Sequence, residues 1–225
     1  ENFMWIRHPD PRKGRMRFEA YGYQKQMIDC FWKFKDSIAL LPRQSGKTTT
    51  AAGFLLWYAM FNPDVHVLIA ANKFNAAKEI MDRVKFTYEE LPDHIRAGAK
   101  VYNVQTIEFE NGSKIESVTT TADSGRGKSI SLLYVDEFAF VKPRIADEFW
   151  TSMAPTLATG GKCIITSTPN SDEDKFAEIW YGAMKTTDEW GNDIENGVGI
   201  NGFKSFTAHY SEVPGRDEAW AAKES

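Results

Sequence analysis

The stretch LLPRQSGKTTTAAG, residues 40–53, decides the fold because it is a variant of a phosphate-binding loop. In the usual loop, G-x-x-x-x-G-K-[ST], backbone N–H groups surround the phosphates, the lysine reaches the outer phosphates and the hydroxyl binds Mg²⁺. Gly46, Lys47 and Thr48 supply the end of this pattern, but Leu41 stands in place of the first glycine. Pro42 has a fixed φ and can shape the turn instead. The loop predicts a nucleotide site, and its context must support it because G-K-T also recurs by chance.

The flanking sequence has the required order of strand, loop and helix. Asp36–Leu41 is a short apolar run that predicts a buried strand over Ser37–Leu41. Lys47–Phe61 is long, apolar and free of proline, as expected of a buried helix. This order points the unpaired N–H groups of the helix N-terminus at the loop, where they stabilise a polyphosphate.

The composition favours one compact domain. The chain has 225 residues, 42% hydrophobic and 26% charged, which suits a single α/β domain over residues 1–225, with a core over about 20–210 and a basic arm over 1–18. The net charge of −4 gives no global sign of nucleic-acid binding. Cys30 and Cys163 lack zinc-site spacing and are interpreted as reduced core residues. No apolar stretch reaches membrane-spanning length, so we expect an intracellular protein without a membrane.

Strand and helix signals alternate along the rest of the chain. Segments 65–71, 130–140 and 162–169 predict strands, and an amphipathic helix is expected within 72–91. An Asn-Gly pair between alternating segments predicts an antiparallel hairpin within 101–118. A helix over Ile145–Met153 is expected to stop at Pro155, and the polar segment 186–201 to be a mobile loop. The fold class is therefore α/β, with a mostly parallel central sheet flanked by helices and an antiparallel excursion.

Two strand ends carry further chemistry. The run LLYVDEFAF, residues 132–140, ends in Asp136 and Glu137, which is the Walker B arrangement: the aspartate binds Mg²⁺ or its water, and the glutamate polarises an attacking water. Alone, such a pair would more simply cap the next segment. The run IITSTPN, residues 164–170, places hydroxyls at Thr166–Thr168, where they are suited to sensing a γ-phosphate.

An aromatic and amide cluster precedes the loop. The amide of Gln24 can pair with an adenine edge, and Tyr21 or Tyr23 can stack on the base. A solvent-exposed glutamine is the commoner explanation of such a residue.

In order, YQ, PRQSGKTT, LLYVDEFAF and TSTPN resemble the Q motif, deviant Walker A, Walker B and coupling motif of the large terminase subunit, the DNA-packaging motor of tailed double-stranded DNA bacteriophages. The resemblance extends from Tyr21 to about Pro214 and includes ANKFNAAKEIMDRVK and the RGKS loop. This family's Walker A typically lacks the first glycine and carries an arginine, which matches Arg43.

The resemblance implies a P-loop NTPase fold of the RecA/ASCE type with ATP and Mg²⁺ as cofactors, and it assigns roles to residues. Lys47 and Thr48 would bind the β,γ-phosphates and the metal, Asp136 the metal, and Glu137 would activate water. Arg43 would be a finger or sensor acting in cis, and Arg126 would reach a neighbouring subunit's nucleotide in trans, although either arginine can instead hold a loop by a salt bridge. The full set of expected nucleotide contacts is Tyr23, Gln24, Arg43, Gln44, Ser45, Gly46, Lys47, Thr48, Thr49 and Thr168.

The resemblance also implies partners: double-stranded DNA, a portal protein, the small terminase subunit and a homo-oligomeric ring, a pentamer on the portal, in the host cytoplasm at the procapsid. Candidate DNA contacts lie in the basic arm Arg7–Arg17 and at Lys73, Lys78, Arg83 and Lys85, although charged helix faces are more often only solvated. The family's C-terminal nuclease domain is not expected within this length.

Two other functions fit part of the pattern. A superfamily-two-like helicase lobe also has a Q motif, Asp-Glu and Thr-Ser-Thr, but Phe138 and Ala139 depart from the usual helicase box, and a second lobe is required. A nucleotide-dependent assembly scaffold is disfavoured by Glu137, because a scaffold needs no water activator.

Overall fold

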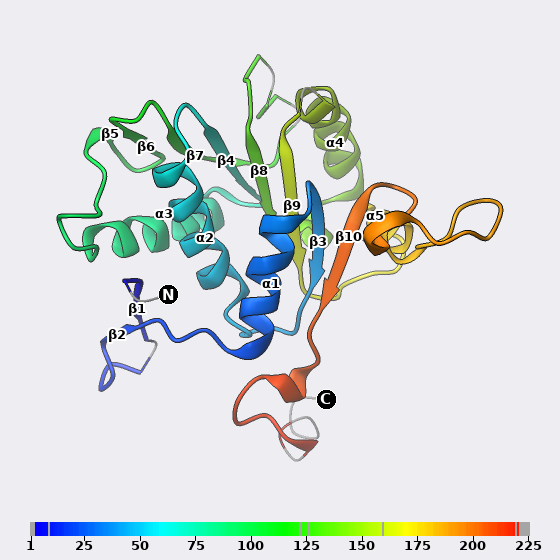
Figure 1. The fold of residues 1–225 in the computed structure, drawn as a ribbon, viewed down its shortest axis with the longest axis horizontal. Coiled ribbons are helices and arrows are strands. Elements are labelled where there is room, and N and C mark those ends of the chain that lie inside the picture. The colour runs from blue at the N-terminus through cyan, green and yellow to red at the C-terminus, as the bar shows by residue number, and fades with distance from the viewer. Residues whose placement is uncertain are drawn as a thin grey trace.

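A central eight-stranded sheet organises the molecule, in the order β10-β3-β9-β8-β4-β7-β6-β5 (Figure 1). The computed structural model describes residues 3–8, 10–121, 123–125, 127–158, 160–218 and 220. The strands are β1 (Trp5–Arg7), β2 (Arg15–Arg17), β3 (Asp36–Leu40), β4 (His66–Ala71), β5 (Ala99–Tyr102), β6 (Thr106–Phe109), β7 (Lys114–Thr119), β8 (Leu132–Asp136), β9 (Lys162–Ser167) and β10 (Phe203–Thr207). The helices are α1 (Gly22–Lys33), α2 (Lys47–Phe61), α3 (Phe74–Glu89), α4 (Pro143–Ala158) and α5 (Lys175–Met184), with 3₁₀ turns η1 (Phe138–Phe140), η2 (Glu195–Gly197) and η3 (Tyr210–Glu212).

The sheet is parallel from β10 through β7, and β6 and β5 continue it in antiparallel pairing. Its central strands are buried on both faces, as parallel strands are when helices cover each side. In β4, Val67 and Ile69 face the core under α1, α2 and α3, whereas Leu68 and Ala70 face the core under α4 and α5. The predicted fold class, including the antiparallel excursion, is confirmed.

Register brings three functional segments to one edge. Leu40 at the end of β3 pairs with Ser167 of β9, and Asp136 at the end of β8 pairs with Thr166. The backbone N–H of Leu41 then donates to the carbonyl of Ser167 at 3.1 Å. The phosphate loop, the acidic tip and the hydroxyl tip therefore share the carboxyl edge of the sheet, where ligands bind in open α/β sheets.

The structure corrects the predicted end of one helix. The expected helix Ile145–Met153 is α4, and it continues through Pro155 to Ala158. Proline removes one helical hydrogen bond. The last turns nevertheless stay helical because Met153 and Leu157 are buried in the core under α4 and α5. Burial of these side chains outweighs the break that the proline alone would predict.

Several elements had no sequence signal strong enough to predict them. These are the two-stranded sheet β1–β2, helix α5 and the edge strand β10. The two-stranded sheet forms within the basic arm and meets α3, where the hydroxyl of Thr87 donates to the carbonyl of Trp5 at 3.2 Å. Both cysteines are free and buried, as predicted. Among the described helices, none combines the length and apolarity that crossing a bilayer requires.

Candidate nucleotide site

The phosphate loop joins β3 to α2 through two left-handed residues. Gln44 has φ 55°, and Gly46, the N-cap of α2, has φ 76°. Glycine is required at position 46, because a Cβ there would also lie 2.7 Å from Nε2 of Gln24. Leu41, in place of the usual first glycine, is buried in the core and continues the strand's hydrogen bonding to β9. The loop therefore forms without that glycine.

The loop meets the acidic tip of β8 directly. Nζ of Lys47 forms an ion pair with Oε1 of Glu137, and the hydroxyl of Thr48 donates to Oδ2 of Asp136 at 3.0 Å. Lys47 is almost fully buried, with 8% of its side chain exposed. A buried cation between two carboxylates marks a site made for charge, because an unpaired buried charge is costly.

The two carboxylates have opposite pKa shifts. Burial raises the pKa of Asp136, and the nearby Lys47 charge and the hydrogen bond from Thr166 offset this only in part. Burial would also raise the pKa of Glu137, but the hydrogen bond and charge of Lys47 and the backbone N–H of Thr168 lower it overall. Lys47 therefore holds Glu137 in a weakly basic, ion-paired form.

The hydroxyl tip of β9 contacts both carboxylates. Thr166 donates from Oγ1 to Oδ1 of Asp136 at 2.8 Å. Oε2 of Glu137 accepts from the backbone N–H of Thr168 at 3.1 Å and from its hydroxyl at 3.2 Å. Glu137 itself is left-handed, with φ 50°, which is strained for a residue with a side chain. Movement of the Glu137 carboxylate must therefore change the contacts of Ser167 and Thr168.

The residues expected at the nucleotide base instead support the loop. Ser45 O accepts from Nε2 of Gln24 at 3.0 Å and from the Tyr23 hydroxyl at 2.5 Å. The other end of the Gln24 amide accepts from the backbone N–H of Tyr21 at 3.0 Å. Both Gln24 and Tyr23 are 2% exposed, so neither presents a free face for an adenine in this conformation. The exposed Tyr21 ring is the aromatic surface at this position.

Three arginines are candidates for phosphate contacts from the sequence, and the structure places a fourth beside the loop. Arg43 is exposed and has no hydrogen-bond or ion-pair partner within the described part of the chain. Arg126 lies outside the described residues. Arg83, a candidate for DNA contact, donates to Oγ1 of Thr49 at 2.9 Å and to Glu79 at 2.7 Å. Arg216, which no sequence pattern indicated, donates to the carbonyl of Gln44 at 3.1 Å.

Other basic candidates are also engaged within the molecule. Lys78 pairs with Asp82, and Nζ of Lys85 donates to the carbonyl of Asn103 and lies over the Tyr102 ring. In the basic arm, Arg15 pairs with Glu90 at 2.7 Å. DNA contacts by these residues stay a prediction.

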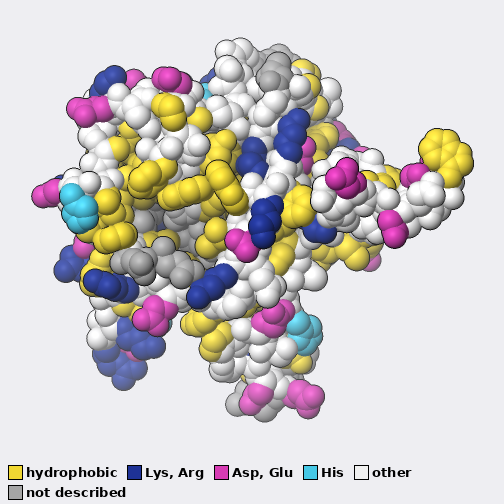
Figure 2. All heavy atoms as spheres, in the orientation of Figure 1, with side chains coloured by type: hydrophobic (Ala, Val, Ile, Leu, Met, Phe, Trp, Pro, Cys, Tyr) yellow, Lys and Arg dark blue, Asp and Glu magenta, His cyan; other side chains and the backbone are white. Residues whose placement is uncertain are grey.

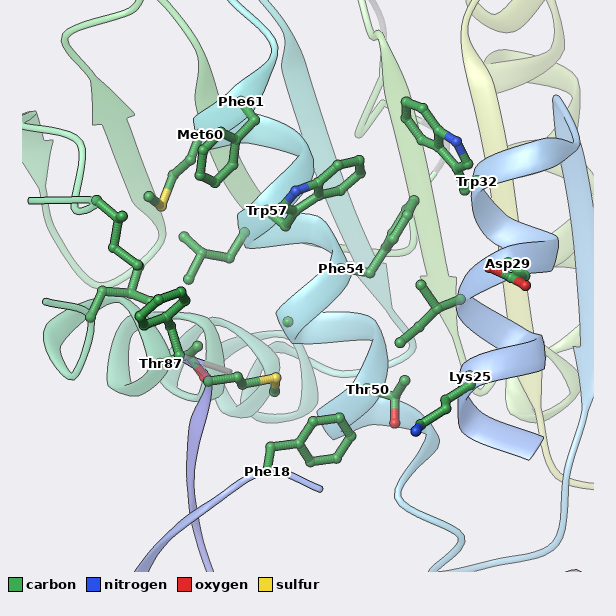
Figure 3. A pocket seen from close by; sticks show the side chains of 17 residues that line it. Phe18, Lys25, Asp29, Trp32, Thr50, Phe54, Trp57, Met60, Phe61 and Thr87 are labelled. Carbon is green, nitrogen blue, oxygen red and sulfur yellow. The ribbon is translucent and has the colours of Figure 1, made fainter. Parts of the chain in front are cut away.

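An apolar groove of about 910 Å³ lies apart from the loop, between α1, α2, α3 and the N-terminal segment (Figure 3). Its lining includes Trp32, Phe54, Trp57 and Phe61, and it forms part of a hydrophobic region on the molecular surface (Figure 2). Lys25 and Asp29 are the charged residues on its wall. Most of its lining residues are apolar, so its chemistry does not suit a polyphosphate.

Residues 38–214 match the family model "Terminase large subunit, T4likevirus-type, N-terminal". The chain belongs to this terminase large-subunit family. The family and the ATP-hydrolysing DNA-packaging motor domain predicted from the sequence are thereby confirmed, and the helicase-lobe and scaffold alternatives are not favoured.

Solved terminase structures share the fold. The ATPase domain of the Thermus phage P74-26 large terminase is 21% identical, with a TM-score of 0.71 over 92% of this chain and 88% of that one. The HK97 bacteriophage large terminase is 16% identical, with a TM-score of 0.64 over 84% of this chain but 43% of that one. A large terminase from a thermophilic bacteriophage, solved in complex with ATP-gamma-S, is 12% identical, with a TM-score of 0.64 over 92% of this chain and 49% of that one.

Proposed function

We propose that this terminase domain hydrolyses ATP between the phosphate loop and the tips of β8 and β9, and that this drives double-stranded DNA into a procapsid. The contact of Lys47 with Glu137, together with that of Thr48 with Asp136, carries the proposal. These contacts join a loop suited to phosphates with carboxylates suited to a metal and a water.

Nucleotide binding would exchange the partners of Lys47. Its ammonium leaves Glu137 for the β- and γ-phosphates, while the N–H groups of Ser45, Gly46 and the first turn of α2 donate to the phosphate oxygens. Thr49 is one of the residues of that first turn whose N–H would donate. Because the ion pair holds down the pKa of Glu137, losing it makes this carboxylate a better proton acceptor.

The donors beside the loop fit Mg²⁺. The Thr48 hydroxyl and the Asp136 carboxylate are the hard oxygen ligands that Mg²⁺ prefers, and Mg²⁺ at such sites otherwise takes water and phosphate oxygens. When bound, the ion would neutralise charge on the β- and γ-phosphate oxygens.

Glu137 would act as the general base. A water oxygen forms a bond to the γ-phosphorus, the bond from that phosphorus to the β,γ-bridging oxygen breaks, and the water proton passes to the Glu137 carboxylate. The exposed Arg43 can turn toward the γ-phosphate in cis, and Arg126 would serve a neighbouring subunit in trans. Loss of the γ-phosphate would then reach residues 166–168 through their hydrogen bonds to Glu137 and Asp136.

The motor would work as a homo-oligomeric ring, a pentamer on the portal protein, in the host cytoplasm. The small terminase subunit would be a further partner, and the basic arm and α3 would supply phosphate contacts to DNA. A trans-acting Arg126 requires such an assembly, because it must reach the nucleotide of another subunit.

Replacement of the general base tests this proposal. We expect Glu137→Gln to lower the steady-state kcat for ATP by about 100-fold or more while ATP binding persists. Glu148→Gln is the matched control, because Glu148 forms a surface ion pair with Arg144 on α4. Equal turnover in Glu137→Gln and wild-type protein would remove the catalytic role from this carboxylate.

A further inference from the structure

One side chain reaches the phosphate loop from the segment after β10. Nη2 of Arg216 donates to the carbonyl of Gln44 at 3.1 Å, across 172 residues of sequence. Its guanidinium lies over the Trp220 ring, 4.4 Å from the ring centroid. Nη1 is buried and has no hydrogen-bond partner among the described residues. The contact therefore holds a cation against the outside of the loop.

The segment that carries Arg216 is anchored to the domain. Ala208 and Val213 are buried in the same core as Tyr23, and the backbone N–H of Arg216 donates to the carbonyl of Val213 at 3.2 Å. The core and this turn thus fix the backbone that carries the Arg216 side chain.

The contact fixes the orientation of one peptide unit. In a planar trans peptide, the C=O and the following N–H point in opposite directions. Arg216 holds the Gln44 carbonyl, so the N–H of Ser45 points away from the guanidinium. Gln24 and Tyr23 hold the Ser45 carbonyl in the same way, which orients the N–H of Gly46. Two successive N–H groups of the loop are therefore oriented by side chains bound to the carbonyls behind them.

Gln44 needs such support. It is left-handed, with φ 55°, a conformation that residues with side chains keep only when their surroundings enforce it. A hydrogen bond from a charged guanidinium is stronger than one between neutral groups. The Arg216 contact is the one among the described side chains that reaches this carbonyl.

We propose that Arg216 is a positioning residue for nucleotide binding: by holding the Gln44 carbonyl, it directs the Ser45 N–H at the phosphates and raises the affinity of the loop for ATP. This rests on the proposed ATP site. By linkage, a bound nucleotide must stabilise the contact of Arg216 in return. Residues 208–216 are thereby coupled to the occupancy of the loop.

Binding measurements on Arg216→Ala, Arg216→Lys and the control Arg144→Ala test the proposal. We expect the dissociation constants of ATP and pyrophosphate to rise about fivefold to tenfold in Arg216→Ala, and less in Arg216→Lys. Adenosine, which has no phosphate, should bind all three variants and the wild type equally. The KM for ATP should rise with its dissociation constant, while kcat changes by less than about twofold, because the reacting groups are untouched.

Equal ATP affinity in Arg216→Ala and Arg144→Ala would overturn the proposal, as would an equal loss of adenosine binding. If Arg216→Ala does not fold, hydrogen exchange of the wild-type chain decides: ATP must increase protection of residues 208–216, and unchanged protection overturns the inference. The proposed function fails separately. Full turnover in Glu137→Gln would remove the catalytic assignment but leave an affinity effect of Arg216 standing.

Discussion

The carboxyl edge of the sheet buries charged and polar side chains, whereas the groove beside α2 exposes apolar ones. At the edge, Lys47, Asp136 and Thr166 are buried. Lys47 forms an ion pair with Glu137, and Thr166 donates a hydrogen bond to Asp136. In the groove, Trp57 and Phe61 are 40% and 59% exposed. Buried charge lowers stability unless it is compensated, so its presence at the edge indicates chemistry. The exposed rings instead form part of a hydrophobic region on the molecular surface, with Lys25 and Asp29 as the charged residues on the groove wall (Figure 2).

The largest expected effect is that of Lys47→Ala. We expect ATP turnover to fall to background, about 1,000-fold or more, because the residue that binds the outer phosphates is gone. The free energy of unfolding should also fall, since Asp136 and Glu137 lose their common cation. Steady-state ATP hydrolysis and urea unfolding measure the two effects. Lys78→Ala, which breaks a surface pair with Asp82, is the control, and turnover comparable to it would refute the assignment.

At Asp136, the charged carboxylate that turnover requires should lower the free energy of unfolding. Its raised pKa means that the folded protein binds this proton more tightly than the unfolded chain does. Stability from this group is therefore lost as pH rises from the ordinary aspartate pKa through the raised one, and the loss persists at pH 7. We expect Asp136→Asn to abolish turnover while raising the free energy of unfolding at pH 7 by about 0.5–2 kcal/mol.

Urea unfolding of wild type and Asp136→Asn across pH measures this difference. The gap between them should narrow as pH falls toward the ordinary pKa of aspartate. A less stable Asp136→Asn at pH 7 would show instead that the hydrogen bonds from Thr48 and Thr166 to a charged carboxylate outweigh the cost of burying it.

The sequence predicted the edge because its signals are local. Apolar runs end at Leu41 and Asp136, and a G-K-T motif opens α2, so parallel strand order alone brings the two tips together. The run IITSTPN likewise indicated hydroxyls at the end of a strand, and the pairing of β8 with β9 brings them beside Asp136. The catalytic and binding roles of these residues stay predictions.

The side chains that support the phosphate loop could not be predicted from local sequence patterns, because they come from distant parts of the chain. Gln24 and Tyr23 suggested base contacts, but the fold buries them against Ser45, 21 and 22 residues away. Arg216 meets Gln44 only because β10 pairs with β3 and carries the following segment to the loop. The predicted helix end at Pro155 was wrong because the proline rule considers only the backbone, whereas burial of Leu157 maintains the last turn of α4.

A substitution of Arg83 tests whether this residue supports the nucleotide site or belongs only to the exposed surface. It links α3 to Thr49 in the first turn of α2, yet 40% of its side chain is exposed. We expect Arg83→Gln to weaken ATP binding by about twofold to fivefold, because Thr49 loses a charged donor. Equilibrium binding of ATP measures this effect, with Lys78→Gln on the same helix as control.

DNA binding by Arg83→Gln separates two roles of this arginine. If ATP affinity is unchanged while DNA binding weakens and its salt dependence becomes shallower, Arg83 is a DNA phosphate contact, as the sequence suggested. Loss of ATP affinity alone would place it with the residues that support the loop.

The smallest expected effect on turnover is in the groove. Trp57 contacts Trp32, Phe54 and Phe61, with ring centroids 5.1, 5.9 and 6.5 Å away. We expect Trp57→Ser to lower the free energy of unfolding by about 1 kcal/mol, through lost aromatic contacts, while ATP turnover changes by less than about twofold. This is the reverse of Asp136→Asn, in which stability rises and turnover is lost. Urea unfolding and steady-state hydrolysis measure both quantities on the same preparation.

Helix α2 makes this last comparison informative, because it begins at Lys47 and ends at Phe61 and so belongs to both regions. If the two regions are independent, a change near its C-terminal end leaves the phosphate loop as it was. A tenfold loss of turnover in Trp57→Ser, with the folded state intact, would show that α2 transmits the state of the groove to Lys47. The apolar surface would then be part of the motor's control rather than a neighbour of its site.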